Sequence, residues 1–385
     1  MRYKTKIKIT LPILFGVLNT AFASALPVDC TQNITEVTTG NWSGCKLFGS
    51  ELYGPPGTQP IYLSFASFIG TNLRGSVFKK INFTSSNFNK ANLSDIAVRD
   101  TNFSAGTFIR TNFSNSIIAD NTHLDRSDFS NANFSNVIIS NSSFENNNFA
   151  NANFANADIY GSKFKNIKNI NKLKFTAATK FESVAFVNTD FSHVKLSEGM
   201  TLERVEFIEL PPVQNASFTK INLLNSTISP IVIKGTLKFE GAHIVKSNLA
   251  FCDKIEKSKC LYEVASPSKK ILFNSIKDNG SNFKLNTKAI VDFTNATLNG
   301  TSFEKSQLVN ANFTGAIFND VDFRGANLSR ANFSKITWAN FLKKVKYDKT
   351  TYFGETKFQD RVCPKTISFG QCDKPNYLGA GRLFY

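Results

Sequence analysis

The chain is poor in the residues on which most active sites depend. Its 385 residues include only 3 histidines, and its 6 cysteines show no C-x-x-C spacing, which disfavours a zinc site. The motifs G-x-S-x-G and G-x-x-x-x-G-K are also missing, so the sequence predicts neither an activated serine nor a phosphate-binding loop. We therefore expect no enzyme activity, no metal ion and no cofactor.

Long apolar runs are absent too, apart from one near the N-terminus. The apolar segment 9–18 follows four basic residues and precedes Ala-Ser-Ala at 23–25, the small residues that a signal peptidase needs. The segment is shorter than the ~20 residues of a membrane span, so an uncleaved anchor is the weaker alternative. We predict a signal peptide over residues 1–25, export to the periplasm or the extracellular space, and no membrane-spanning segment in the mature chain.

What the chain has instead is a five-residue period of apolar side chains. Every fifth residue is apolar from Leu63 to Ile118, and a second such run extends from Phe293 to Trp338. Five residues form no stripe on a helix, because each step turns ~140° around the axis. On a straight strand an odd spacing alternates between faces. The chain must therefore turn between repeats, which predicts stacked coils with the apolar side chains inside.

The residues around each apolar centre strengthen this prediction. The residue two positions before the centre is small or β-branched, as at Ala311 and Ala326, and asparagine usually lies between the two, as in "ANFTG", "ANLSR" and "ANFSK". The pattern resembles the pentapeptide-repeat family, in a secreted, bacterial-type form, clearly over 61–162 and 291–340 and loosely over 181–249. The resemblance implies an all-β fold, a right-handed quadrilateral parallel β-helix. Each coil would contain four pentapeptides, with Phe or Leu stacked along the axis.

Interruptions of the period do not divide the array into domains. One residue is inserted after Ile118, within "DNTHLD". The period is lost or irregular in three segments: 165–180, 209–215 and 251–282. We predict one interrupted solenoid over 61–340, with an N-terminal cap at 26–60 and a C-terminal cap at 341–385. In the latter, "VKYDKTTYFGETKF" resembles the turn that closes such arrays.

Six cysteines in an exported chain favour disulfides. Because coils of ~20 residues rise only ~4.8 Å each, cysteines far apart in the sequence lie far apart along the axis, which favours local pairs. The predicted pairs are Cys30 with Cys45, Cys252 with Cys260, and Cys363 with Cys372. The first and last would staple the solenoid ends, where unpaired strand edges are exposed.

Positive charge is concentrated in the C-terminal part of the chain. The formal net charge is +16, of which the signal contributes +4, residues 26–60 contribute −2 and residues 61–162 are balanced, so +14 falls on 163–385. Such an excess favours an anionic partner such as lipopolysaccharide, phospholipid headgroups, acidic glycan or extracellular DNA; ordinary solvated lysine is the alternative. "KNIKNINKLK" and "KKVKYDK" are the densest runs. The candidate contacts are Lys343, Lys344 and Lys346.

Two functions known on related folds are disfavoured. Inhibition of DNA gyrase within the family uses an acidic rod that mimics DNA, which a basic, exported chain does not resemble. Glycan-active enzymes on larger parallel β-helices use clustered acidic and basic residues. Here His193 and His243 stand alone, and Asp120, His123 and Asp125 crowd the insertion in "DNTHLD". Turn formation explains this group, and a weak site is the alternative.

The sequence thus predicts an exported, non-enzymatic rod that acts as an interaction or structural scaffold for a macromolecular partner. A binder of anionic surface polymers through the basic half is the second hypothesis, and a glycan-active enzyme is the third. The core positions specify the fold, whereas the outward residues that would specify a partner show only polarity and charge. The partner and the oligomeric state stay unassigned.

Overall fold

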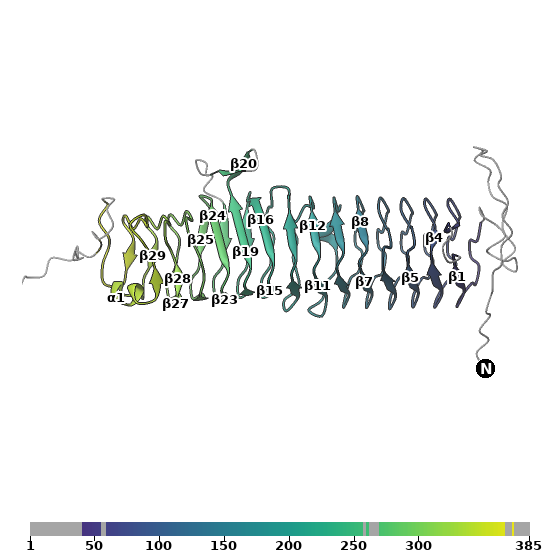
Figure 1. The fold of residues 1–385 in the computed structure, drawn as a ribbon, viewed down its shortest axis with the longest axis horizontal. Coiled ribbons are helices and arrows are strands. Elements are labelled where there is room, and N and C mark those ends of the chain that lie inside the picture. The colour runs from purple at the N-terminus through teal and green to yellow at the C-terminus, as the bar shows by residue number, and fades with distance from the viewer. Residues whose placement is uncertain (1–40, 55–58, 257–258, 262–268, 366–371, 373–385) are drawn as a thin grey trace, which may run out of the picture. The chain divides into compact units, whose positions relative to one another are not determined.

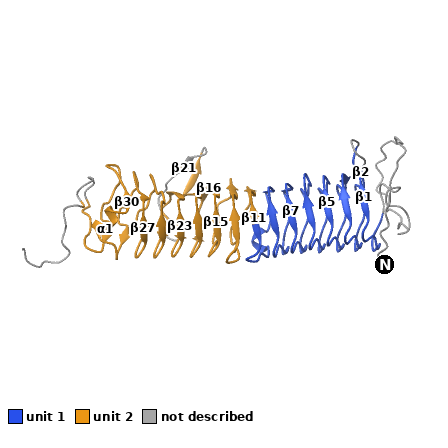
Figure 2. Cartoon of the chain, turned by 60° about the horizontal axis from the view of Figure 1, so that its bottom comes forward, with its two compact units in different colours: residues 1–180 blue, residues 181–385 orange. Residues whose placement is uncertain are grey.

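The computed structural model describes residues 41–54, 59–256, 259–261, 269–365 and 372. The chain divides into two compact units, Met1–Lys180 and Phe181–Tyr385, which Figure 2 shows in different colours. In each unit short strands stack as successive coils (Figure 1). The predicted signal peptide, residues 1–25, lies outside the described residues.

Unit 1 is a parallel, four-sided β-solenoid. Asn102, Thr107, Asn112 and Ile117 follow one another in one coil, and each pairs in parallel with the next coil, so the coil has four hydrogen-bonded sides. Equivalent residues are 20 or 21 positions apart. One side contains β1 (Glu51–Tyr53), β3 (Val77–Lys79), β5 (Ala97–Arg99), β6 (Ile117–Ala119), β7 (Ile138–Ser140) and β9 (Asp158–Tyr160). A second side contains β2 (Ile61–Tyr62), β4 (Ile81–Asn82), β8 (Ser143–Glu145) and β10 (Lys163–Lys165), and the 3-10 helix η1 (Ile170–Lys172) comes after β10.

The five-residue period has a local cause. The centre Phe83 and the residue two before it, Ile81, are each 1% exposed, so both point into the coil. Two residues after the centre, Ser85 turns the chain with a φ of 61°, a left-handed conformation that suits corners and is common for Gly and Asn. Across the same corner the Asn82 side chain accepts a hydrogen bond from the backbone N–H of Thr84 at 2.9 Å. Each pentapeptide therefore forms one side and one corner.

Phenylalanine rings fill the interior of the coils. Rings one coil apart stack face to face, as Phe293 and Phe313 do at 5.0 Å and 1°. Rings on opposite sides of a coil meet edge to face across the interior, as Phe313 and Phe323 do at 5.8 Å and 88°. Both geometries are favourable for aromatic pairs. The predicted inward position of Phe313 and Phe323 is confirmed, because each is 0% exposed.

Unit 2 is built in the same way. One side contains β11 (Lys180–Glu182), β13 (Thr201–Glu203), β15 (Asn222–Leu224), β18 (His243–Val245), β23 (Lys277–Asn279), β26 (Thr297–Asn299) and β27 (Ile317–Asn319). A second contains β12 (Ala185–Val187), β14 (Glu206–Ile208), β16 (Thr227–Val232), β19 (Asn248–Cys252) and β24 (Asn282–Asn286), and a third contains β17 (Thr236–Lys238), β22 (Lys270–Leu272) and β25 (Ile290–Asp292). Near the C-terminus, β28 (Val321–Asp322) pairs with β30 (Val345–Lys346), and β29 (Asn332–Phe333) pairs with β31 (Lys357–Phe358).

Parallel pairing extends into both segments that the sequence assigns to caps. Within 26–60, β1 pairs with β3, and Asn41 pairs with Ser67. The same five-residue spacing continues there in weaker form, with buried Trp42 and Leu52. Parallel pairing needs only backbone N–H and C=O groups and a side chain that fits inside, so the coil continues where the repeat consensus ends.

The C-terminal segment departs from the prediction in one respect. Trp338, the last centre of the second apolar run, is buried but belongs to helix α1 (Trp338–Leu342) and not to a strand. The chain then returns to the coil through β30 and β31. The closing turn includes Thr351, whose hydroxyl donates to the carbonyl of Phe323 at 3.0 Å.

The interruptions prove to be shorter than the sequence indicates. In 165–180, Ile167 and Ile170 are buried and Lys174 pairs with Asn153, so the chain stays in the coil. In 209–215, Val213 pairs with Ile233 in the next coil. In both segments the backbone stays in the coil, but an extra residue lengthens it: Asn148 pairs with Lys168, 20 positions on, whereas Asn153 pairs with Lys174, 21 positions on.

The prediction that 251–282 is irregular requires a correction. Among the described residues of this segment, an antiparallel hairpin, β20 (Lys254–Glu256) and β21 (Lys259–Leu261), leaves the coil, whereas β22, β23 and β24 pair in parallel with the preceding coil. The insert raises the separation of equivalent residues from 21 to 34. The period is hidden because Asp278 occupies a buried position between Ile244 and Leu298, where a leucine or phenylalanine is expected.

The single inserted residue of "DNTHLD" is absorbed at a corner, as predicted. Asp120 and Asn121 both have positive φ, 43° and 56°, where other corners have one such residue. Register resumes with His123 paired to Asn102. In the described part of the chain no helix has the length and apolar character needed to cross a membrane.

Candidate functional site

The group predicted around the insertion does not form a catalytic arrangement. The Ser143 hydroxyl lies 2.7 and 2.9 Å from the carboxylate oxygens of Asp125, and His123 Nδ1 lies 3.3 Å from the same hydroxyl. In a Ser-His-Asp triad the imidazole lies between the serine and the carboxylate, but here the serine bonds the carboxylate directly. Asp125 also accepts the backbone N–H of Glu145 at 2.7 Å, while Asp120 pairs with Arg99 at 3.5 Å. These contacts join adjacent coils, which supports the turn-forming interpretation.

The predicted basic cluster near the C-terminus is only partly available for a partner. Lys343 and Lys344 follow α1 and are exposed. Lys346, on β30, is exposed but forms an ion pair with Asp320 at 2.8 Å. The structure therefore brings the three lysines to one corner, and the charge of one is largely offset.

A larger group of lysines lies in the last coil of unit 1. Residues 163–180 contain six lysines and no acidic residue: Lys163, Lys165, Lys168, Lys172, Lys174 and Lys180. We call these six residues the lysine belt. Lys163 and Lys165 flank buried Phe164 on β10, and Lys168 and Lys174 lie on the next two sides of the coil, paired with Asn148 and Asn153. The coil before it, 143–162, has two acidic residues and no basic one.

Asparagine ladders cover much of the remaining surface of unit 1. The side-chain amide of Asn112 donates to Asn92 at 3.3 Å, Asn133 donates to Asn112 at 3.0 Å and Asn153 donates to Asn133 at 3.1 Å. Their side-chain oxygens also accept the N–H two residues on, as Asn112 does from Ser114 at 3.1 Å. The ladders explain why asparagine precedes the centre of so many repeats.

The hairpin of unit 2 is anchored at its base. Cys252 and Cys260 form a disulfide with Cα atoms 5.4 Å apart. The buried carboxylate of Asp253 accepts from Lys269 at 3.3 Å, where the chain returns from the hairpin, and from Thr287 at 2.9 Å in the next coil. Figure 1 shows the hairpin standing off the stacked strands, beside β19 and β24.

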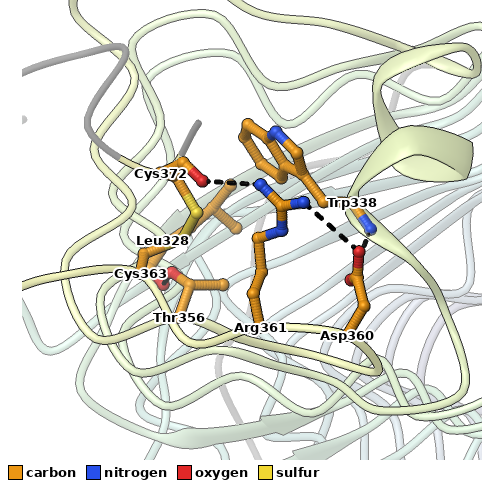
Figure 3. Close-up of a disulfide and its surroundings, with 7 residues drawn as sticks. All are labelled: Leu328, Trp338, Thr356, Asp360, Arg361, Cys363 and Cys372. Carbon is orange, nitrogen blue, oxygen red and sulfur yellow. Dashed lines mark hydrogen bonds and ion pairs between the residues drawn. A yellow bond between two sulfur atoms is a disulfide. The ribbon is translucent and has the colours of Figure 1, made fainter. Parts of the chain in front are cut away.

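A second disulfide organises the C-terminal cap (Figure 3). Cys363 and Cys372 are joined, with Cα atoms 4.6 Å apart. The Arg361 guanidinium donates to the carbonyl of Cys372 at 2.9 Å and lies 3.4 Å from Asp360, whose carboxylate accepts the backbone N–H of Trp338 at 2.9 Å. Arg361 and Asp360 thus link the residues of the disulfide to the start of α1.

These bonds are two of the three local pairs expected from the sequence. Cys45 is also disulfide-bonded, and its expected partner, Cys30, lies outside the described residues. Among the described residues no group of three or more His, Cys, Asp or Glu side chains is arranged to hold a metal ion. A polar hollow of about 420 Å³ beside β24, lined by Asn282, Lys284 and Ser302 among others, has no nucleophile–base pair.

The repeat pattern is matched by a known family model. The model, described as pentapeptide repeats, matches 8 copies in residues 61–96, 127–166, 291–325 and 306–337. The chain carries pentapeptide repeats. The matched segments lie within regular coils of both units and do not include the hairpin.

Several solved pentapeptide-repeat structures are similar to the chain. HetL from Nostoc sp. strain PCC 7120, involved in the regulation of heterocyst differentiation, is 13% identical over 85% of this chain and 91% of its own, with a TM-score of 0.17. Rfr23 from Cyanothece 51142 is 18% identical over 37% and 90%, with a TM-score of 0.19. QnrB1, a plasmid-mediated fluoroquinolone resistance protein, is 11% identical over 79% and 93%, with a TM-score of 0.15. No curated protein matches the chain significantly. At these identities and scores the likenesses carry no functional argument.

One buried polar residue of the pentapeptide-repeat core escaped the sequence analysis. Asp278 is 3% exposed, and its Oδ1 has no hydrogen-bond partner in the described structure, while the other oxygen accepts from Thr301 and, at 3.4 Å, from Ser281 N–H. Burial raises the pKa of the Asp278 carboxyl above its ordinary value of 3.8, although the Ser281 and Thr301 hydrogen bonds oppose the shift. The sequence feature that could have identified this residue is its spacing. Asp278 stands five positions after Phe273 and five before Phe283, at the centre of a repeat.

Proposed function

We propose that this pentapeptide-repeat chain is an exported, non-enzymatic scaffold that presents its sides to a macromolecular partner. The observation that supports this most directly is the filled interior. The centres of the repeats, such as Phe293, Leu298 and Phe303, are 0% exposed and occupy the space in which a small ligand would bind. The side chains available for chemistry therefore lie on the outer surface, where they form hydrogen-bond ladders and ion pairs between coils.

Export is part of this proposal. Disulfides form and persist in oxidising compartments, and the two bonds at Cys252–Cys260 and Cys363–Cys372 support export together with the N-terminal sequence. The test is expression with the native N-terminus in a bacterial host, followed by fractionation and N-terminal sequencing. We expect a mature chain in the periplasm or the medium that begins after Ala25. A full-length chain retained in the cytoplasm would contradict export.

The scaffold proposal is tested by capture of a partner. Full-length protein carrying a photo-crosslinker on an outward side chain, such as Ile117 or Ile317, would be exposed to envelope and culture-fluid fractions. We expect one discrete macromolecule to be crosslinked. We also expect purified protein without the crosslinker to bind the same macromolecule. Turnover of a glycan panel by purified protein would contradict a non-enzymatic role.

A second candidate function is the binding of anionic surface polymers. Its specific support is the excess of +14 on residues 163–385 together with exposed lysines such as Lys343 and Lys344. Heparin binding by the full-length protein, measured as a function of salt, tests it. We expect the affinity to fall steeply with salt, because screening limits the reach of each charge to about 8 Å at physiological ionic strength. Absence of heparin binding at low salt would reject this function and leave the scaffold proposal in place.

A further inference from the structure

The positive charge of the chain is not spread evenly over its basic part. Six of the positive charges of residues 163–385 lie in the lysine belt, within a single coil of unit 1. Register shows how this coil differs from the one before it: Lys163 is paired with Ser143, Lys168 with Asn148 and Lys174 with Asn153. At three outward positions, uncharged polar residues of one coil are thus replaced by lysine in the next.

Most of the belt lysines form no ion pair in the described structure. Lys165 forms an ion pair with Glu145 at 2.7 Å, and none of the other belt lysines has an ion-pair partner within the described ranges. The preceding coil offers only one other acidic residue, Asp158 on β9. The hydrogen bond from Lys165, assisted by the charges of Lys165 and Lys163, lowers the pKa of Glu145 below its ordinary value of 4.5, which indicates a positive local field.

The belt encircles the coil. Lys163 precedes the buried Phe164, Lys168 and Lys174 lie on successive sides, and Lys180 begins β11 on the remaining side. All four of these lysines are exposed. Neighbouring lysines lie two to six residues apart, and two residues of strand span only ~7 Å, comparable to the screening length in physiological salt. The electrostatic fields of neighbouring belt lysines therefore overlap along a path that runs around the outside of the coil, transverse to the solenoid axis.

Amide groups border this path on the side of the preceding coil. Asn166 donates to Asn146 at 2.8 Å, Asn169 donates to Asn148 at 2.8 Å, and the hydroxyl of Thr176 donates to Asn156 at 2.7 Å. Side-chain amides can both donate to and accept from hydroxyl groups. The surface thus combines cationic groups with polar groups suited to sugar hydroxyls.

We propose that the lysine belt is a binding site for an acidic polysaccharide, whose chain runs around the coil and across the solenoid axis. The proposal rests on the second candidate function, the binding of anionic polymers, and assigns it a site and a ligand class. Carboxylate or sulfate groups of the polymer would contact Lys163, Lys168, Lys172 and Lys174. Its hydroxyl groups would contact the adjacent amides.

The geometry favours a flexible polymer over the other anionic partners. A membrane surface is flat and reaches the lysines of one side only. Duplex DNA is too stiff to bend around a single coil, since its persistence length is about 50 nm. Single-stranded nucleic acid is usually bound with aromatic stacking platforms, but in this coil Phe164 is buried and Phe175 is half-buried.

The experiment compares two matched variants of the full-length protein. The belt variant combines Lys163→Gln, Lys168→Gln, Lys172→Gln and Lys174→Gln, and retains Lys165 because of its ion pair. The control combines four exposed lysines of unit 2 that lie in four different coils: Lys195→Gln, Lys234→Gln, Lys284→Gln and Lys335→Gln. Both remove the same charge. Thermal melting checks that both fold, which we expect because all eight side chains are exposed.

Polygalacturonate and heparin serve as probes at low salt, with anionic vesicles and a short DNA duplex as competitors. We expect the belt variant to lose about tenfold or more in affinity for polygalacturonate and the control to lose about twofold or less, because clustered charges sum into a stronger local field. We also expect polygalacturonate to be preferred over vesicles and duplex.

Three results would overturn the proposal. Equal losses of affinity in the two variants would show diffuse attraction. A loss of affinity seen only in a third variant, Lys343→Gln with Lys344→Gln, would place the site at the C-terminal corner. Either result would leave polymer binding by the protein intact. Preference for vesicles or duplex would reject the ligand class. By contrast, a wild-type protein that binds no anionic polymer would reject the second candidate function itself.

Discussion

Single residues in the coil interior have large effects because each one is in contact with rings above, below and beside it. Phe313 stacks on Phe293 and on Phe333, with ring centroids 5.0 and 4.8 Å away, and meets Phe303 and Phe323 edge to face. A buried aromatic side chain in this setting contributes through area removed from water and through favourable ring geometry. The interior positions therefore tolerate polarity poorly.

Replacement of Phe313 tests this directly. We expect Phe313→Asp to lower the free energy of unfolding by about 3–5 kcal/mol, since the rings lose their stacking partner and a carboxylate is buried without one. Urea denaturation followed by circular dichroism measures the change. Asn310→Asp, at an exposed corner, is the control and should shift the midpoint little. An unchanged midpoint in Phe313→Asp would contradict the inward assignment.

Asp278 is the natural exception to this rule, and it makes stability depend on pH. Its carboxyl pKa is raised by burial, so the folded state binds the proton more tightly than the unfolded state. The stabilising contribution of the protonated carboxyl is complete below the ordinary pKa of 3.8 and is lost as the pH rises through the raised value. Ionised Asp278 would be a buried charge in the apolar column between Ile244 and Leu298.

We expect Asp278→Leu to stabilise the protein relative to wild type at pH 8 and to do so much less at pH 4. Urea midpoints of both proteins measured between these pH values give the comparison. Asp292→Leu, at a partly exposed position on β25, is the control and should not reproduce this pH dependence. A stabilisation of equal size at both pH values would mean that the carboxyl is uncharged throughout.

At the scale of elements, the backbone can continue the coil where the repeat pattern of side chains is interrupted. The parallel ladder continues from β18 to β23 although 34 residues separate equivalent positions, because the hairpin leaves and re-enters the coil at neighbouring points. Asp253 fixes that exit through Lys269 and Thr287, and the Cys252–Cys260 bond closes the hairpin. An insertion held in this way need not disturb the coils on either side.

Removal of the hairpin disulfide should therefore have a local effect. We expect Cys252→Ser with Cys260→Ser to increase proteolytic cleavage between residues 253 and 269 while the melting temperature of the coils changes little. Cys363→Ser with Cys372→Ser is the comparison. It should lower the melting temperature more, because that bond holds the last coil and the partners of Arg361. Limited proteolysis with mass spectrometry and thermal melting distinguish the two, and equal effects on both readouts would contradict this division.

At the scale of the whole molecule, the backbone pairs between described strands of the coils join residues one coil apart, so each coil contacts its neighbours in the stack. Disulfides that follow this rule must be local as well. Non-reducing peptide mapping of the exported protein should recover Cys30 joined to Cys45, alongside the pairs at Cys252–Cys260 and Cys363–Cys372. A crosslink between Cys30 or Cys45 and either of the last two cysteines would contradict an extended solenoid.

The sequence by itself determined the solenoid, its regular coils and the local cysteine pairs, because each pentapeptide encodes one side and one corner through short-range requirements. A centre such as Phe83, a small residue before it and a left-handed corner at Ser85 are readable without knowledge of neighbours. The tertiary structure decided the rest. Which residues lie side by side depends on coil lengths summed along the chain, and insertions of one or many residues change that register. Only the folded chain therefore revealed that Asp278 lies in the core, that 251–282 is mostly coil, that Ser143 joins Asp125, and that the lysines of 163–180 encircle one coil.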